Sequence, residues 1–213
     1  MSVRLSAYDL HKALTQIAPH VSDDFALPVL NAARLEVDGG NLFAIATDRF
    51  TMAVARIGIV ETATWQAHIP SEQLPTVIAW LDAAGTVTIT LEAAADGDLT
   101  RLTFDDGAGG LRIDTDTSGA SHFPDWRKYV SEHLSEPSEP ILGSGLDAGF
   151  LARWRHAGER FRASQAGSHK PLILMDDDAT FIGMQMPVRW ESAGRDELVG
   201  QWVRILAPVA ATA

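Results

Sequence analysis

The sequence predicts an α+β protein whose antiparallel sheets carry helices on one face. Segments with apolar residues at helical spacing are followed by runs that alternate or are rich in β-branched residues, and Asp/Gly turns separate these runs. The order helix, three strands, helix, three strands indicates an internal repeat near residues 5–65 and 66–118, and a third cycle begins after residue 140. The chain is therefore expected to hold about three repeated α-β3 units.

The first unit is expected to open with a helix over residues 6–21. Leu10, Leu14 and Ile17 recur at helical spacing, and Ser6 is a suitable N-cap. An Asp-Gly-Gly-Asn sequence then gives a strong turn signal between strands. The strands of this unit are expected at residues 28–37, 42–46 and 50–57.

The second unit repeats this order. Ser71 is expected to cap its helix, Pro75 is tolerated in the first turn, and Gly85 ends the helix. An apolar stripe between these positions supports the helix. The strands that follow are expected at residues 86–92, 99–104 and 111–117.

The third unit is preceded by a polar, proline-bearing stretch at residues 131–140, which we interpret as a linker or exposed loop. A helix is expected over residues 149–157 with Gly158 as its stop, and strands at residues 160–165, 171–175 and 180–189. The extension at 191–213 has apolar residues at helical spacing and could form an amphipathic helix. It would either pack on its own domain or cover an open sheet edge or neighbouring subunit.

Composition excludes several classes of protein. The 213 residues are 46% hydrophobic and 21% charged, as in ordinary globular proteins. The net charge of −11 argues against an all-over basic DNA-binding surface, although a local basic face remains open. Absence of cysteine removes disulfides, thiolate nucleophiles and cysteine-bound zinc, and fits a cytoplasmic protein. No signal peptide or membrane span is evident.

Catalysis is the class with the least support. The sequence holds no nucleophile elbow, phosphate loop, zinc-protease motif or dinucleotide fingerprint, so we expect neither an enzyme nor a bound cofactor. The Asp176-Asp177-Asp178 run is better interpreted as a solvated turn than as a metal site, because neighbouring side chains in an extended chain point to opposite faces.

Four ordered segments resemble one known family. The segments LPVLNAARLEVDGGNLFAIATDRFTMAVARI, HIPSEQLPTVIAWLD, HFPDWRKYV and FIGMQMPVRW are similar, in order and spacing, to the bacterial β sliding clamp, the processivity subunit of DNA polymerase III. The resemblance implies a DNA-clamp-like fold. It also implies that residues 1–130 form a domain like the family's middle domain, that residues 131–190 form a partial domain like the second half of its last domain, and that residues 191–213 are an extension. The family's first domain and the first half of its last domain have no counterpart here.

The resemblance also gives a second interpretation of Thr47-Asp48-Arg49, which lies between two apolar runs. On its own this stretch is a turn, in which Asp48 caps the backbone with its carboxylate. In the family, clients such as polymerases insert a short apolar peptide into a pocket lined by this corner, the Phe-Pro-Asp linker and a C-terminal Met-rich strand. The matching positions here are Leu30, Thr47, Arg49, Phe50, Met52, Phe123, Pro124, Lys128, Met184, Met186, Pro187 and Val188.

Two departures and one alternative bear on this pocket. The family usually has a Gly-His-Arg-like corner where Arg49-Phe50-Thr51 stands, and it ends in Leu where this chain runs on past Trp190. The alternative for Met184 and Met186 is ordinary core filling at strand spacing.

The resemblance implies a non-catalytic accessory subunit that tethers a DNA polymerase or other client to duplex DNA. As a homo-oligomeric ring, with a clamp loader as a further partner, it would contact phosphates without sequence preference. The residues expected to face DNA are Lys12, Arg153, Arg155 and Arg160. Two alternatives stay open: the basic stretch at 153–162 could be an ordinary solvated helix face, and the chain could be a clamp-derived module that binds client peptides without encircling DNA.

Overall fold

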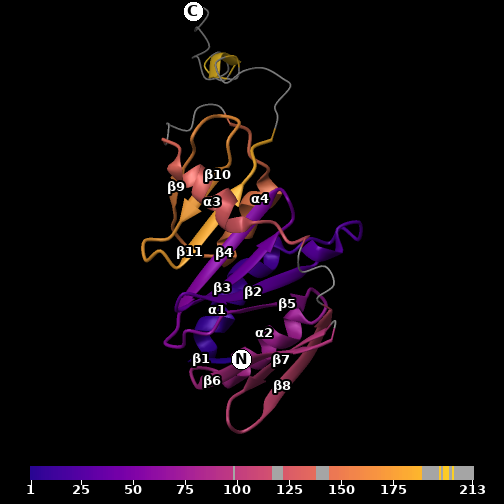
Figure 1. Ribbon diagram of the computed structural model, residues 1–213. Helices are drawn as coiled ribbons and strands as arrows, with labels where there is room; N and C mark the ends of the chain where they lie inside the picture. Colours follow the sequence, from indigo (N-terminus) through magenta and orange to yellow (C-terminus); the bar gives the residue numbers. More distant parts are fainter. Residues whose placement is uncertain are drawn as a thin grey trace, which may run out of the picture.

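Two antiparallel sheets form the framework of the protein (Figure 1). The computed structural model describes residues 1–97, 99–116, 122–137 and 144–188, with a few positions between 197 and 203. A four-stranded sheet has the order β1-β6-β7-β8, and a seven-stranded sheet has the order β5-β2-β3-β4-β11-β10-β9. The strands are β1 (Ser2–Ser6), β2 (Ala32–Asp38), β3 (Asn41–Thr47), β4 (Thr51–Gly58), β5 (Trp65–Pro70), β6 (Thr88–Asp96), β7 (Leu99–Asp105), β8 (Gly110–Asp116), β9 (Arg162–Ser164), β10 (Leu172–Met175) and β11 (Phe181–Gln185).

The helices follow the predicted order, with one addition. They are α1 (Ala7–Ile17), α2 (Leu74–Ala84), α3 (Trp126–Ser135) and α4 (Ala148–Arg153), with short 3-10 turns η1 (Ala18–His20), η2 (Pro28–Leu30) and η4 (Trp154–His156). The α+β class with antiparallel sheets and repeated helix-and-strand units is confirmed. The predicted C-terminal helix falls mostly outside the described residues.

Each of the first two units begins with a strand that the sequence analysis missed. β1 precedes α1 and pairs with β6 of the second unit, whereas β5 precedes α2 and pairs with β2 of the first unit. The two units therefore exchange their leading strands, which joins the repeat into one body. Both strands are short, and their partner strands lie far away in the sequence. No turn sequence of a hairpin therefore predicts them.

The ends of α1 and α2 are set differently. Ser6 caps α1 as predicted, and its hydroxyl accepts a hydrogen bond from Asp9 N at 3.4 Å. The prediction that Ser71 caps the second helix was wrong. α2 begins at Leu74 without a side-chain cap, because residues 71–73 form a turn in which Ser71 N donates to the carbonyl oxygen of Asn31.

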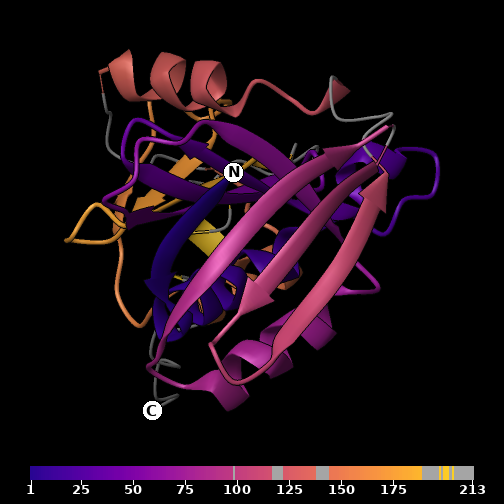
Figure 2. The same ribbon diagram turned by 60° about the horizontal axis from the view of Figure 1, so that its bottom comes forward.

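The seven-stranded sheet is covered on both faces. One face of β3 and β4 packs against α1 in a first core cluster, which includes Leu10, Leu14 and Ala44. The opposite face belongs to a second core cluster, which includes Trp126 and Val130 of α3. Figure 2 shows α3 on one side of these strands and α1 on the other. This arrangement explains why β3 reads as an almost continuous apolar run, since strands buried on both faces do not alternate.

α3 corrects the first half of the linker or loop predicted at 131–140, because the helix runs to Ser135. Residues 136 and 137 are not helical, and residues 138–140 lie outside the described residues. Asp125 caps it by accepting from Lys128 N at 3.1 Å. Trp126 lies over the sheet, where its indole N–H donates to Glu36 Oε2 at 3.3 Å and Arg127 also binds the Glu36 carboxylate. Of the polar residues that suggested a linker, Ser131, Glu132 and Ser135 lie at exposed positions of this helix.

β4 and β11 join the two predicted domains in one sheet, with Gly183 opposite Ala53. Gly183 leaves room for Trp154, which is buried and stacks on His20 with ring centroids 4.2 Å apart. A Cβ atom at Gly183 would lie 2.4 Å from Trp154 Cζ3.

We expect Gly183→Ala to lower the free energy of unfolding by about 2 kcal/mol, because the rigid indole of Trp154 has to shift to make room for the added methyl group. Urea denaturation of this variant beside Gly58→Ala checks the prediction, since a Cβ at Gly58 meets no atom within 4 Å. Equal stability of the two variants would contradict the packing described here.

Candidate functional site

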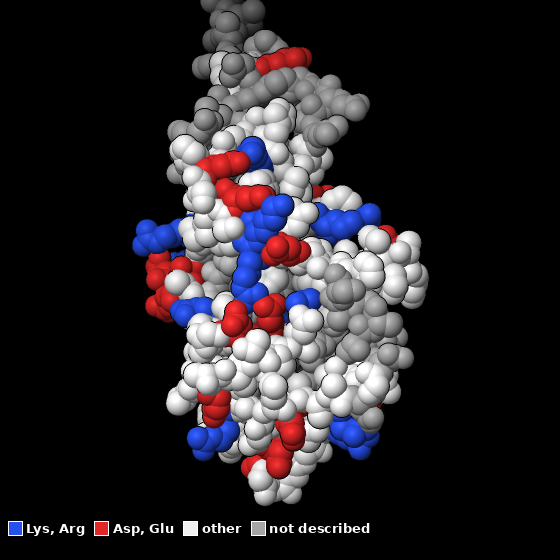
Figure 3. Space-filling model, in the orientation of Figure 1, with Lys and Arg blue, Asp and Glu red and all other residues white. Residues whose placement is uncertain are grey.

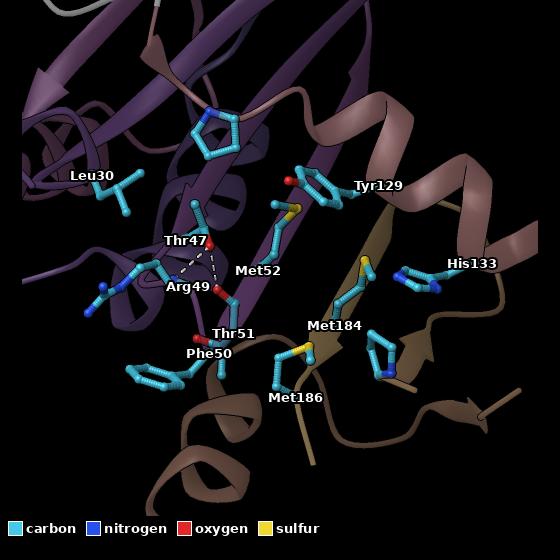
Figure 4. A pocket seen from close by; sticks show the side chains of 12 residues that line it. Leu30, Thr47, Arg49, Phe50, Thr51, Met52, Tyr129, His133, Met184 and Met186 are labelled. Atoms are coloured by element: carbon cyan, nitrogen blue, oxygen red, sulfur yellow. Dashed lines mark hydrogen bonds between the residues drawn. The ribbon is translucent and has the colours of Figure 1, made fainter. Parts of the chain in front are cut away.

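A pocket opens where the corner between β3 and β4 meets β11 and α3. It encloses about 330 Å³, and its walls come from segments far apart in the sequence. In Figure 4, Met52 and Met184 lie on neighbouring strands, and Tyr129 and His133 project from α3 on the other side. The lining consists of Leu30, Thr47, Arg49, Phe50, Thr51, Met52, Pro124, Tyr129, His133, Pro171, Met184 and Met186.

The corner itself is held by hydrogen bonds within residues 47–51. Asp48 Oδ1 accepts from Phe50 N at 3.0 Å, from Thr51 N at 2.7 Å and from the Thr51 hydroxyl at 3.0 Å. The Thr47 hydroxyl donates to the Thr51 carbonyl oxygen at 2.7 Å and accepts from Arg49 N (Figure 4). Asp48 therefore caps the turn, as the sequence predicts, and the turn presents Thr47 to the pocket.

Arg49 adopts a left-handed backbone conformation with a φ angle of +76°. This conformation costs a residue other than glycine about 1 kcal/mol. Its side chain offsets part of that cost, because Arg49 Nη2 lies 3.3 Å from Asp24 Oδ2. The corner is thus tied to the loop before η2 as well as to itself.

Asp48 also connects the corner to α4. Arg153 Nη1 donates to Asp48 Oδ2 and, at 3.2 Å, to Thr51 Oγ1. Phe50 and Phe150 stack with centroids 5.6 Å apart beside this pair. Burial opposes ionisation of Asp48, but the hydrogen bonds from Arg153 and Thr51 outweigh it and lower the pKa of this carboxyl.

A buried histidine completes this network. His20 Nδ1 lies 3.0 Å from Thr51 Oγ1, whose own proton goes to Asp48, so Nδ1 carries the proton and donates. His20 Nε2 has no hydrogen-bond partner among the described residues. Burial and the nearby Arg153 lower the pKa of His20 to about 3, so its ring is neutral.

Eight of the twelve residues expected from the resemblance line the pocket, and four lie beside it. Phe123 is buried in the cluster beneath α3, and Lys128 points to solvent with its Nζ 3.9 Å from Glu132 Oε1. Pro187 is partly buried outside the lining, and Val188 N donates to the Gly145 carbonyl oxygen.

Core filling, the alternative for the two methionines, fits Met184 on β11 but not Met186, which follows that strand. Met184 is 7% exposed, lies opposite Met52 in the ladder and belongs to the second core cluster. Met186 is 42% exposed and contributes to the open side of the pocket. A ligand can therefore reach Met186 without disturbing the core.

Four lining residues were missed: Thr51, Tyr129, His133 and Pro171. Tyr129 and His133 are four residues apart on α3 and so share one face of that helix. The interpretation of 131–140 as a linker hid this spacing. The signal that could have found it is Asp125 as a cap before apolar residues at helical spacing.

Comparison with solved structures identifies the fold. The chain matches the DNA polymerase III β subunit of Thermotoga maritima with a TM-score of 0.65 at 13% identity, over 89% of this chain and 66% of that one. The C. crescentus β sliding clamp matches with a TM-score of 0.64 at 16% identity, over 89% and 65%. The Pseudomonas aeruginosa sliding clamp, solved bound to griselimycin, matches with a TM-score of 0.64 at 14% identity, over 89% and 66%. The fold is that of the bacterial β sliding clamp.

The clamp likeness has a defined extent. The chain spans slightly less than two thirds of the length of these clamps. No protein-family model matches the sequence. At this level of identity the comparison establishes the clamp fold, and the roles of individual residues depend on the geometry of this chain.

The four residues expected to face DNA have different environments in this clamp fold. Arg153 forms an ion pair with Asp48, and its side chain is 29% exposed. Lys12 on α1, Arg155 and Arg160 are exposed. Figure 3 shows the opposite side of the molecule, which α3 covers, and on that side Lys and Arg side chains are interleaved with Asp and Glu.

The acidic run at residues 176–178 belongs to the turn between β10 and β11. Asp176 Oδ1 accepts from Thr180 N and Phe181 N, so the acidic run closes a hairpin turn as predicted. Across the described ranges, no group of three or more His, Asp or Glu could hold a metal ion. No helix in the same ranges has the length and apolar character needed to cross a membrane.

Proposed function

We propose that this clamp-fold chain is a docking protein that receives a short apolar peptide of a client, such as a DNA polymerase, in the pocket at the β3–β4 corner. The observation that carries the proposal is the convergence of Met52, Met184 and Met186 from adjoining segments with Pro124 and Tyr129 from the α3 segment. The resemblance to β sliding clamps supports it independently, because the family uses the corresponding place for its clients.

The chemistry of the pocket suits such a peptide. Methionine side chains adapt to differently shaped apolar anchors, and the proline fixes part of the rim. Thr47, Arg49 and His133 add polar groups that can orient a peptide backbone. A peptide with two apolar anchors, such as Leu and Phe, is expected to bind with a micromolar dissociation constant, about −8 kcal/mol.

Met186→Asp is expected to weaken this binding by about 2 kcal/mol or more, because the peptide would desolvate the new carboxylate. The fold should persist, since Met186 is 42% exposed. Fluorescence anisotropy with a labelled Leu/Phe peptide, together with a melting curve, measures both effects. Griselimycin, which the P. aeruginosa clamp binds, is a second probe for the same variants.

Two further variants separate loss of binding from loss of folding. Val87→Asp places the same charge at a 45% exposed position outside the pocket and should bind the peptide normally. Met184→Asp places it at a 7% exposed position and should unfold the protein. Unchanged peptide binding by Met186→Asp would reject the pocket as the docking site.

The charge of the helix face favours docking over encirclement of DNA. In β sliding clamps the helices line the hole, but here α1 and α2 together carry one lysine, Lys12, against Asp9 and Asp82. Duplex phosphates would meet no net attraction from these two helices.

We therefore expect equal retention of the protein on circular and linear plasmid at physiological salt. A pull-down on immobilised plasmid before and after linearisation measures this. Selective retention on the circle, lost in the Arg155→Glu/Arg160→Glu variant, would instead assign a DNA-enclosing ring and restore the role expected for these arginines.

A further inference from the structure

A second, larger cavity lies between α1 and α2, away from the β3–β4 corner. The two helices pack side by side (Figure 1), and the cavity of about 710 Å³ extends from the end of α1 along α2. Its floor is apolar and includes Val21, Leu74 and Ile78. A groove of this size between two helices can accept side chains from a third helix.

Phe25 stands at the edge of this groove and is 94% exposed. The loop that carries it is built by hydrogen bonds: Ala26 N donates to Asp24 Oδ1 at 2.9 Å, and Leu27 N donates to the Asp24 carbonyl oxygen at 3.0 Å. The ion pair between Asp24 and Arg49 fastens the same loop to the corner. An aromatic ring held in water by an ordered loop is apolar surface available to a partner.

The rim of the groove is acidic. Asp23 and Asp82 line it, and the side chain of Asp82 is 79% exposed. Among the residues that the structure describes, no Lys or Arg lines the groove, and His11 Nε2 lies 4.0 Å from Asp82 Oδ1. An apolar floor with carboxylates in its lining is complementary to an apolar stripe flanked by cations.

We propose that the α1–α2 groove binds an amphipathic helical segment of a protein partner, whose apolar side chains contact Phe25 and Ile78 and whose Lys or Arg residues pair with Asp23 and Asp82. The carboxylates select against nucleic acid, which carries phosphates. This second surface shares no lining residue with the peptide pocket, and the Asp24–Arg49 ion pair connects the loop of Phe25 to the corner.

The test uses a short helical peptide of leucine and lysine as the probe, with the matching leucine and glutamate peptide as its charge control. Phe25→Ser and Asp82→Lys should each weaken binding of the leucine/lysine peptide about tenfold. Val60→Ser removes another highly exposed apolar side chain, and Asp178→Lys makes the same charge reversal on the β10–β11 hairpin. Both control variants should bind as the unmodified protein does, and the glutamate peptide should not bind.

Three outcomes would overturn the proposal. The first is no binding of the leucine/lysine peptide to the unmodified protein. The second is equal weakening by Asp82→Lys and Asp178→Lys, which would show only general attraction to an acidic protein. The third is loss of binding in Met186→Asp, which would place the peptide in the other pocket. Because Met186→Asp should leave groove binding intact, failure of this proposal is distinguishable from failure of the docking pocket.

Discussion

Lowering the pH from 6.5 to 5 is expected to destabilise the protein by about 2 kcal/mol per pH unit or more, because two buried histidines remain neutral in the folded state. His20 is fully buried and His68 is 5% exposed. Burial, aided by Arg153, lowers the pKa of His20 to about 3; burial, aided by Arg34, lowers that of His68 to about 4. Each therefore contributes about 1.4 kcal/mol per pH unit where only the unfolded chain is protonated.

The direction follows from which state binds the proton. Well above pH 6.5 neither state is protonated at these rings, and their contribution to stability is constant. Below pH 6.5 these imidazoles bind protons in the unfolded chain but stay neutral in the folded protein. The free energy of unfolding therefore falls until the pH reaches the pKa values of the folded state. The lowered pKa of Asp48 and that of Glu36 act in the same direction but below pH 5, because an unfolded carboxyl titrates near pH 4.

Urea denaturation at several pH values between 7.5 and 5 measures this slope. His20→Gln and His68→Gln should each remove about half of this slope, whatever they do to stability at neutral pH. His169→Gln, at an exposed position, is the matched control and should leave the slope unchanged. A free energy of unfolding that stays constant from pH 6.5 to pH 5 would contradict the burial of neutral rings.

Asp48→Ala is expected to lower the free energy of unfolding by about 3 kcal/mol, since it removes a carboxylate that serves two structural elements. The turn would lose its acceptor for Phe50 N and Thr51 N, and Arg153 would be left without its anion at a site where its side chain is 29% exposed. Thermal or urea unfolding measures the loss, with Asp178→Ala on an exposed hairpin as the control.

A double-mutant cycle separates the two losses. Asp48→Ala/Arg153→Met should recover part of the stability lost in Asp48→Ala, because the unpaired guanidinium is replaced by an apolar side chain. The unrecovered part belongs to the turn. If the two substitutions add without coupling, the ion pair contributes nothing to the fold.

The sequence predicts local features of this protein better than distant ones. Ser6 as a helix cap and Asp48 as a turn cap could both be predicted, because each acts on backbone within a few residues. The pairing of Asp48 with Arg153 could not, since the two residues are 105 positions apart and the arginine looks like a free surface charge in the sequence.

The same limit applies to the sheets and to the pocket. The exchange of β1 and β5 between repeats involves partners from different units and leaves no local signal. Tyr129 and His133 were missed because a Ser- and Glu-rich helix face looks like a linker when the buried side, Trp126 and Val130, is not considered with it. The resemblance to the clamp family located the methionine side of the pocket but not the helix that closes it.

Methyl NMR of the methionines tests the docking pocket most directly. The chain has five methionines, so each methyl signal can be assigned by single substitution. Titration with the Leu/Phe peptide should shift the signals of Met52, Met184 and Met186, which line the pocket, and leave those of Met1 and Met175 in place. Shifts of Met1 or Met175 without the other three, or no shift at saturating peptide, would contradict peptide docking at the β3–β4 corner.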